Sequence, residues 1–137
     1  MTLQELYSLY YIKQEIEDFK LKIIELREQA ESITPKYSDA PSGGGCSDKV
    51  GNAVATIAVY EDMLADAITR KTEQAMKITE YILSIDDPQL RRIMYLRFIE
   101  HLSWRAIAER IGGGNTEDGV RKRCNRYVRK FESKKIA

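Results

Sequence analysis

Two long apolar stripes constrain this chain more than any other feature of its sequence. Between positions 9 and 33, apolar residues recur at alternating spacings of three and four, which is the a/d pattern of a coiled-coil helix. The same spacing recurs from position 50 to position 85. A helix with such a stripe must bury it, and the other stripe is the nearest apolar surface. The pattern predicts two long helices over about residues 2–33 and 48–85. The stripes are Leu9, Ile12, Ile16, Phe19, Ile23, Leu26, Ala30 and Ile33, then Val50, Val54, Ile57, Glu61, Leu64, Ile68, Lys71, Ala75, Ile78, Ile82 and Ile85.

The segment between the stripes, TPKYSDAPSGGGCSD at 34–48, contains two prolines and three consecutive glycines, which disfavour a continuous helix. We therefore expect residues 1–85 to form an antiparallel, coiled-coil-like αα-hairpin with its loop at 34–48. The hairpin could be a spacer within one chain, or it could form a homodimer or hold a partner protein. The second interpretation is favoured because apolar residues outside the two stripes would stay exposed in a hairpin of two helices alone. These are Leu3, Leu6, Tyr7, Tyr10 and Tyr11 near the start, and Tyr60, Met63 and Ala67 beside the second stripe.

The distribution of charge divides the chain into two parts. The whole chain of 137 residues carries a formal net charge of +1. Residues 1–85 hold nine Lys and Arg against fourteen Asp and Glu, whereas residues 86–137 hold thirteen against seven. A basic half favours a polyanionic partner. We expect a domain boundary at 85/86.

Several classes of protein are disfavoured by what the sequence lacks. No apolar run approaches the roughly 18 residues of a membrane span, and the first residues lead directly into a charged amphipathic segment rather than a signal peptide. Cys46, Cys124 and His101 share no ligand spacing, so we expect neither a disulfide scaffold nor a metal site, and a cytoplasmic location. No nucleophile–base pair can be assembled, so we expect no enzyme and no cofactor.

Residues 86–137 carry the signals of three helices. Asp87 and Pro88 are a typical helix start, and that helix should run to about residue 100. Ser103 should cap a short helix from Trp104 to Ile111, with Trp104 in the core, and the glycines at 112–114 should end it. Asn115 or Thr116 should cap a last helix that runs to about residue 133. A short helix, a turn and a longer basic helix are typical of a helix-turn-helix.

Winding the last helix at about 100° per residue separates two faces. The side predicted to be buried holds Val120, Cys124, Tyr127, Val128 and Phe131. The opposite side carries cations and an asparagine, which suit the major groove: Arg and Lys can pair with guanine or phosphate, and Asn with adenine. We predict base contacts from Lys122, Asn125 and Arg126, and phosphate contacts from Arg121, Arg123, Arg129 and Lys130. Thr116 and Asp118 complete the predicted DNA-binding set.

The stretch LRFIEHLSWRAIAERIG, followed by VRKRCNRYVRKF, resembles region 4 of bacterial sigma factors, which reads the −35 promoter element. The whole chain resembles phage and prophage late-gene regulators of the RinA/ArpU type, including the loop residues Tyr37-Ser38-Asp39-Ala40-Pro41-Ser42-Gly43-Gly44 and Ser47-Asp48. The resemblance implies an all-α regulator of phage or prophage transcription that binds double-stranded DNA and contacts the RNA polymerase of its bacterial host. Two alternatives remain open. One is a small terminase subunit that marks DNA for packaging, and the other is a polymerase- or protein-interaction module that does not itself read DNA.

Overall fold

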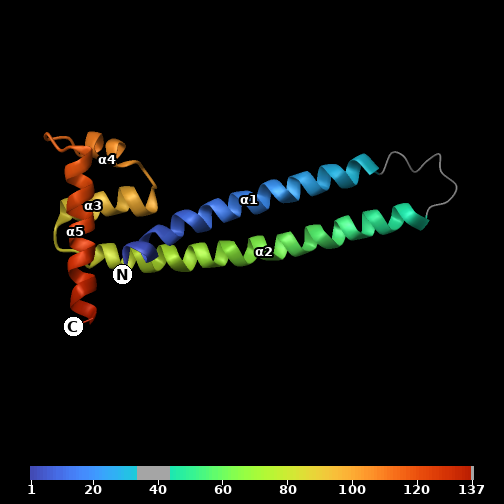
Figure 1. Cartoon of the computed structure of the whole chain (residues 1–137), viewed down its shortest axis with the longest axis horizontal. Helices are drawn as coiled ribbons and strands as arrows, with labels where there is room; N and C mark the ends of the chain where they lie inside the picture. The colour runs from blue at the N-terminus through green and yellow to red at the C-terminus, as the bar shows by residue number, and fades with distance from the viewer. Residues whose placement is uncertain (34–43, 137) are drawn as a thin grey trace. The chain divides into compact units, whose positions relative to one another are not determined.

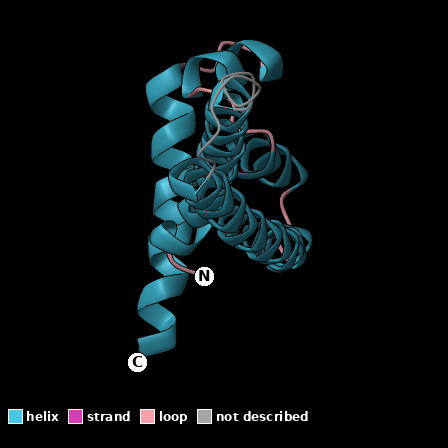
Figure 2. Cartoon of the chain, turned by 90° about the vertical axis from the view of Figure 1, so that its right-hand side faces the viewer, coloured by secondary structure: helices cyan, strands magenta, loops and turns pink. Residues whose placement is uncertain are grey.

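The computed structural model describes the backbone of residues 1–33 and 44–136, and the side chains of residues 1–31 and 51–132. Every described regular segment is helical, so the predicted all-α class is confirmed (Figures 1 and 2). None of these helices, over the described residues, has the length and apolar character needed to cross a membrane. The elements are α1 (Leu3–Ile33), α2 (Gly44–Leu83), α3 (Pro88–Met94), the π-helix η2 (Tyr95–Ile99), α4 (Trp104–Ile111) and α5 (Glu117–Ile136).

The two long helices begin in different ways. The backbone N–H of Glu5 donates to Thr2 Oγ1 at 3.0 Å and that of Thr2 donates to Glu5 Oε2 at 3.1 Å, which makes a capping box at the start of α1. The helix α2 begins at Gly44, whereas the predicted loop extended to residue 48. The last five residues of that loop are therefore helical. Glycine costs a helix only about 1 kcal/mol and, unlike proline, leaves its N–H in place. Residues 34–43 lie outside the described residues.

The chain forms two compact units, which do not divide at the predicted boundary. One unit is residues 13–70, and the other combines residues 1–12 with residues 71–137. The boundary expected at 85/86 marks the turn between α2 and α3, which is a break in secondary structure. It does not mark a break in packing, because the last turns of α2 share a core with the helices that follow.

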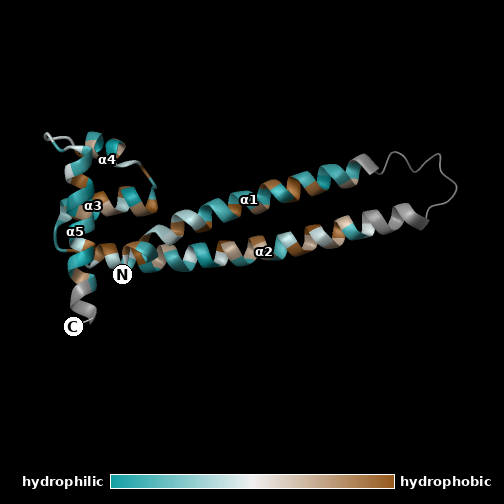
Figure 3. Cartoon of the chain, viewed as in Figure 1, coloured by the Kyte–Doolittle hydropathy of each residue, from teal (hydrophilic) through white to brown (hydrophobic). Residues whose placement is uncertain are grey.

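In the unit 13–70, α1 and α2 run antiparallel, with hydrophilic and hydrophobic segments alternating along both (Figures 1 and 3). Arg27 Nη2 pairs with Glu61 Oε1 at 2.7 Å, and Arg70 Nη2 pairs with Glu15 Oε1 at 3.4 Å. These two pairs join early residues of one helix to late residues of the other. Both are exposed, so they contribute little stability and mainly mark the register.

The stripe predicted on α1 is correct at Ile16 and Ile23, which are buried. The stripe predicted along α2 is correct at Ile78, Ile82 and Ile85, which are buried. It is wrong at Val54 and Ile68, which are 58% and 46% exposed, whereas Ala67 is fully buried.

Two overlapping stripes on α2 share Ile57, Leu64 and Ile78. They differ at the positions between these residues, and those positions determine which stripe packs against α1. Tyr60 packs near Phe19, with 6.1 Å between ring centroids. This register leaves Glu61 at the exposed edge, where it pairs with Arg27, instead of burying an unpaired carboxylate. Tyr60 and Ala67 were predicted to lie outside the stripe and to be available to a partner. They belong instead to the interface between α1 and α2.

The second unit has one apolar core, to which every helix contributes. Leu6 and Leu9 of α1, Ile78 and Ile82 near the end of α2, and Ile85 in the turn after it are buried in this core. The remaining buried members are Leu90, Ile93, Met94, Leu96, Phe98, Trp104, Ile107, Ala108, Val120, Cys124 and Val128. The predicted core position of Trp104 is confirmed, because its side chain is 8% exposed.

Where α3 continues into η2, the backbone hydrogen bonds span five residues instead of four, and the N–H of Glu100 donates to the carbonyl of Tyr95 at 3.1 Å. The helix ends at a reversal in which the N–H of Leu102 donates to the carbonyl of Leu96 at 3.0 Å and His101 adopts a φ of 58°. Arg97 occupies the space beside this reversal. Its guanidinium lies 4.4 Å from the Trp104 ring centroid and donates to the Leu102 carbonyl at 3.0 Å. It also donates to the Tyr7 hydroxyl at 3.3 Å, so this charged side chain joins α1 to the start of α4.

Candidate nucleic-acid interface

Capping residues at both ends of the turn fix where α4 and α5 begin and end. Ser103 Oγ accepts from the N–H of Ala106 at 3.1 Å and caps α4, as predicted. Gly112, Gly113 and Gly114 all have φ between 64° and 79°, a conformation that favours glycine. These glycines therefore end α4 and reverse the chain.

The first turn of α5 is capped by Thr116, because its Oγ1 accepts from the N–H of Gly119 at 3.0 Å. Asn115 takes a different role: its side-chain amide donates to the carbonyl of Gly112 at 2.7 Å across the glycine turn. The sequence left open which of the two caps the helix, and the structure assigns the cap to Thr116. This hydroxyl orients the helix start.

One face of α5 packs into the core. Val120, Cys124 and Val128 are buried, as predicted, and Tyr127 is half-buried. Phe131, which was also predicted to be buried, is 40% exposed and lies 4.6 Å from Tyr127 between ring centroids. The prediction is wrong at this position because Phe131 lies outside the buried core, of which Val128 is the last member on α5.

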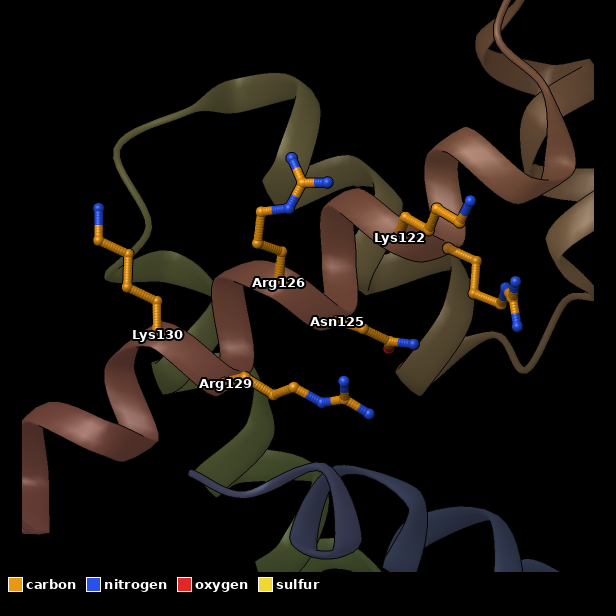
Figure 4. A pocket seen from close by; sticks show the side chains of 6 residues that line it. Lys122, Asn125, Arg126, Arg129 and Lys130 are labelled. Atoms are coloured by element: carbon orange, nitrogen blue, oxygen red, sulfur yellow. The ribbon is translucent and has the colours of Figure 1, made fainter.

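The opposite face of α5 forms a basic groove of about 680 Å³. Figure 4 shows side chains of this face projecting from consecutive turns of the helix. Six side chains line it, and all six belong to the set predicted from the sequence: Arg121, Lys122, Asn125, Arg126, Arg129 and Lys130. Five of the six are cationic, so the groove favours an anion.

Asp118 compensates part of this charge. It is exposed in the first turn of α5 and pairs with Lys122 at 3.1 Å and with Arg121. Hydrogen bonds from Lys122 and Arg121 hold the pKa of the Asp118 carboxyl below its usual value. The carboxylate thus orients two cations at one end of the groove and partly offsets their charge.

Arg123 does not lie in the groove, although the sequence predicted it as a phosphate contact. Its guanidinium donates to Asp87 Oδ2 and to Gln89 Oε1 at the start of α3. Asp87 also caps α3 by accepting from the N–H groups of Gln89 and Leu90. Desolvation acts to raise the pKa of Asp87, but these backbone donors and Arg123 hold it below its usual value. Arg123 therefore ties α5 to α3.

Asn125 differs from the cations around it. It is half-buried, and its Oδ1 is shielded from solvent with no hydrogen-bond partner among the described residues. Most shielded polar atoms in proteins have a partner, so this oxygen is an exception.

A second hollow of about 350 Å³ was not predicted as a site. Three tyrosines of α1 line it together with Arg97, His101 and Ser103. The tyrosines are Tyr7, Tyr10 and Tyr11, and the Tyr10 ring lies 5.5 Å from that of His101 between centroids. The sequence signal was present, since these tyrosines were singled out as leftover apolar residues. Their proximity to residues 97–103 depends on tertiary packing that no local pattern encodes.

Metal binding and nucleophilic thiol chemistry receive little support from the described side chains. They contain no group of three or more His, Cys, Asp or Glu residues arranged to hold a metal ion. Burial raises the pKa of the Cys124 thiol to about 12, so this sulfur is protonated at neutral pH and is a poor nucleophile.

Comparisons of the chain with protein-family models, with curated proteins and with solved structures found no match.

Proposed function

We propose that this chain is a sequence-specific double-stranded-DNA-binding protein that regulates transcription of phage or prophage genes. The observation that carries the proposal is the groove on α5. Its five cations and one asparagine lie on the face opposite Val120, Cys124 and Val128. One side of α5 is thus held by the core, while the other presents donors suited to phosphates and base edges.

The dimensions of α5 suit a major groove. An α-helix with its side chains is about 10–12 Å in diameter. The major groove of B-DNA is about 12 Å wide. We propose that α4 and α5 act as a sigma-region-4-like helix-turn-helix with α5 as its recognition helix. Lys122, Asn125 and Arg126 would face base edges, and Arg121, Arg129 and Lys130 would contact phosphates.

The resemblance to sigma region 4 and to RinA/ArpU-type regulators supports promoter DNA as the target and host RNA polymerase as a second partner, in the bacterial cytoplasm. For the unit 13–70 we propose a role in homodimerisation. Exposed apolar side chains on both of its helices support this role, among them Leu21, Ile24 and Val54. Light scattering tests it: a dimer is expected, whereas a ring of many subunits would favour the small-terminase alternative.

The DNA-binding proposal is tested by fluorescence anisotropy at about 150 mM salt, with duplexes tiled across the neighbourhood of the gene and a scrambled control. One tile should bind at least about 10³-fold more tightly than the control. The variant Lys122→Ala/Arg126→Ala should lose that margin. The matched variant Lys20→Ala/Lys22→Ala, which removes two lysines of the unit 13–70, should keep it.

Two outcomes would overturn the proposal. If all duplexes bind equally, sequence-specific recognition is wrong. If none binds, the chain does not read DNA, and a pull-down of RNA polymerase then tests the protein-interaction alternative.

A further inference from the structure

Asn125 is the one acceptor among the six described side chains that line the groove. The other five are Lys and Arg, which only donate hydrogen bonds. Asn125 lies one helical turn after Lys122 and one turn before Arg129, so it occupies the middle of this face (Figure 4). The nearby carboxylate of Asp118 is already paired with Arg121 and Lys122. Among the described side chains that line the groove, Asn125 therefore carries the one acceptor without a partner.

The carbonyl oxygen of Asn125 needs a donor that the described residues do not supply. Its Oδ1 is shielded from solvent and unpartnered. Such an atom raises the free energy of the protein until a donor reaches it. Rotation about the soft Cβ–Cγ bond can turn the amide so that both Oδ1 and Nδ2 face the groove.

Among the parts of DNA, few can satisfy this oxygen. Phosphate oxygens, guanine N7 and O6, and thymine O4 are all acceptors. In the major groove only adenine N6 and cytosine N4 donate, and only adenine places an acceptor, N7, beside its donor. An asparagine amide matches that edge with both of its polar atoms.

We infer that Asn125 is a specificity-determining residue of this groove and that its ligand is the N6/N7 edge of an adenine. Asn125 Oδ1 accepts from adenine N6, and Nδ2 donates to N7. This inference rests on the proposed DNA-binding function. It adds that one position of the operator requires adenine, beside the positions that Lys122 and Arg126 would contact.

The first test selects binding sites from a random duplex library with the wild-type chain and with Asn125→Ala. The wild type should favour adenine at one position by about 5- to 150-fold, as a bidentate contact does. In Asn125→Ala that preference should fall to near one, while preferences at the other positions and the salt dependence of binding stay unchanged. Lys122→Ala, on the same face, should keep the adenine preference.

The second test changes the DNA and leaves the protein intact. Purine in place of that adenine lacks the N6 amine, and 7-deazaadenine lacks N7. Each analogue should weaken wild-type binding by about 5-fold or more, and neither should weaken binding of Asn125→Ala further.

A third variant distinguishes a change in base preference from a loss of folding. Asn125→Asp has the same shape but cannot donate to N7, so its preference should move from adenine towards cytosine, whose N4 donates to a carboxylate. Circular dichroism should show the same helix content for all variants.

The possible results separate the two claims. If Asn125→Ala keeps the adenine preference, or if the analogues weaken both proteins equally, the inference is wrong although DNA binding stands. If no duplex binds with a dependence on salt, the proposed function is wrong and the inference falls with it.

Discussion

Arg123 and Lys130 lie on the same helix, and the sequence predicts both as phosphate contacts. The structure separates them. Lys130 is exposed and lines the groove, whereas Arg123 is half-buried and bound to Asp87 and Gln89. Replacing each by alanine should therefore change two different properties: Lys130→Ala should weaken DNA binding, and Arg123→Ala should lower the melting temperature.

The magnitude follows from the number of phosphate contacts proposed for the groove, which are Arg121, Arg129 and Lys130. Each contact contributes about −0.9 to the slope of log K against log salt, so three give about −2.7. Between 50 and 200 mM salt the wild type should then lose about 40-fold in affinity. Lys130→Ala should have a slope of about −1.8 and lose only about 12-fold over the same range.

Arg123→Ala should keep the wild-type slope, because its guanidinium is directed to α3. Its melting temperature should fall, since the change removes the guanidinium that joins α5 to the Asp87 cap. Both variants are measured by anisotropy titrations at four salt concentrations and by thermal unfolding followed by circular dichroism. The reasoning is refuted if Arg123→Ala reduces the slope by about 0.9 without changing the melting temperature, or if Lys130→Ala leaves the slope unchanged.

Three further predictions concern the core of the same unit. His101→Gly should be more stable than His101→Ala by about 1 kcal/mol in urea unfolding, because position 101 has a positive φ; the reverse order would contradict this account. Tyr81→Phe should unfold at the same or a higher urea concentration, because the Tyr81 hydroxyl is shielded and has no hydrogen-bond partner in the described part of the chain; a clear loss of stability would contradict it. In a Cys46→Ser background, Cys124 should react with a thiol reagent at pH 8 only after unfolding, because burial raises its pKa to about 12; rapid labelling of the folded protein would contradict it.

The features predicted best from the sequence depend on near neighbours in the chain. Asp87 and Ser103 cap their helices as expected, because a cap needs only the backbone N–H groups two or three residues further on. Gly112 ends α4 for the same kind of local reason. The buried face of α5 also follows from helical winding alone, at Val120 and Cys124.

The predictions are wrong where residues far apart in the sequence determine how a side chain packs. On α2 the apolar pattern allows two registers, and the packing of Tyr60 near Phe19 on the other helix selects between them. Winding α5 correctly places Arg123 at the edge of the exposed face. It cannot reveal that Asp87, 36 residues earlier, accepts a hydrogen bond from the Arg123 guanidinium. An ion pair between separate helices has no periodic signal in the sequence.

The position of α5 depends on residues at the opposite end of the chain. Leu6 and Leu9 share a core with Val128 of α5, and Tyr7 accepts from Arg97, whose guanidinium covers Trp104 at the start of α4. The breaks in helix at 84–87 and 100–103 thus separate segments that nevertheless pack as one body. Because the first turns of α1 complete this core, the groove on α5 is held by the whole unit of residues 1–12 and 71–137, and the basic segment 86–137 is only part of the structure that presents it.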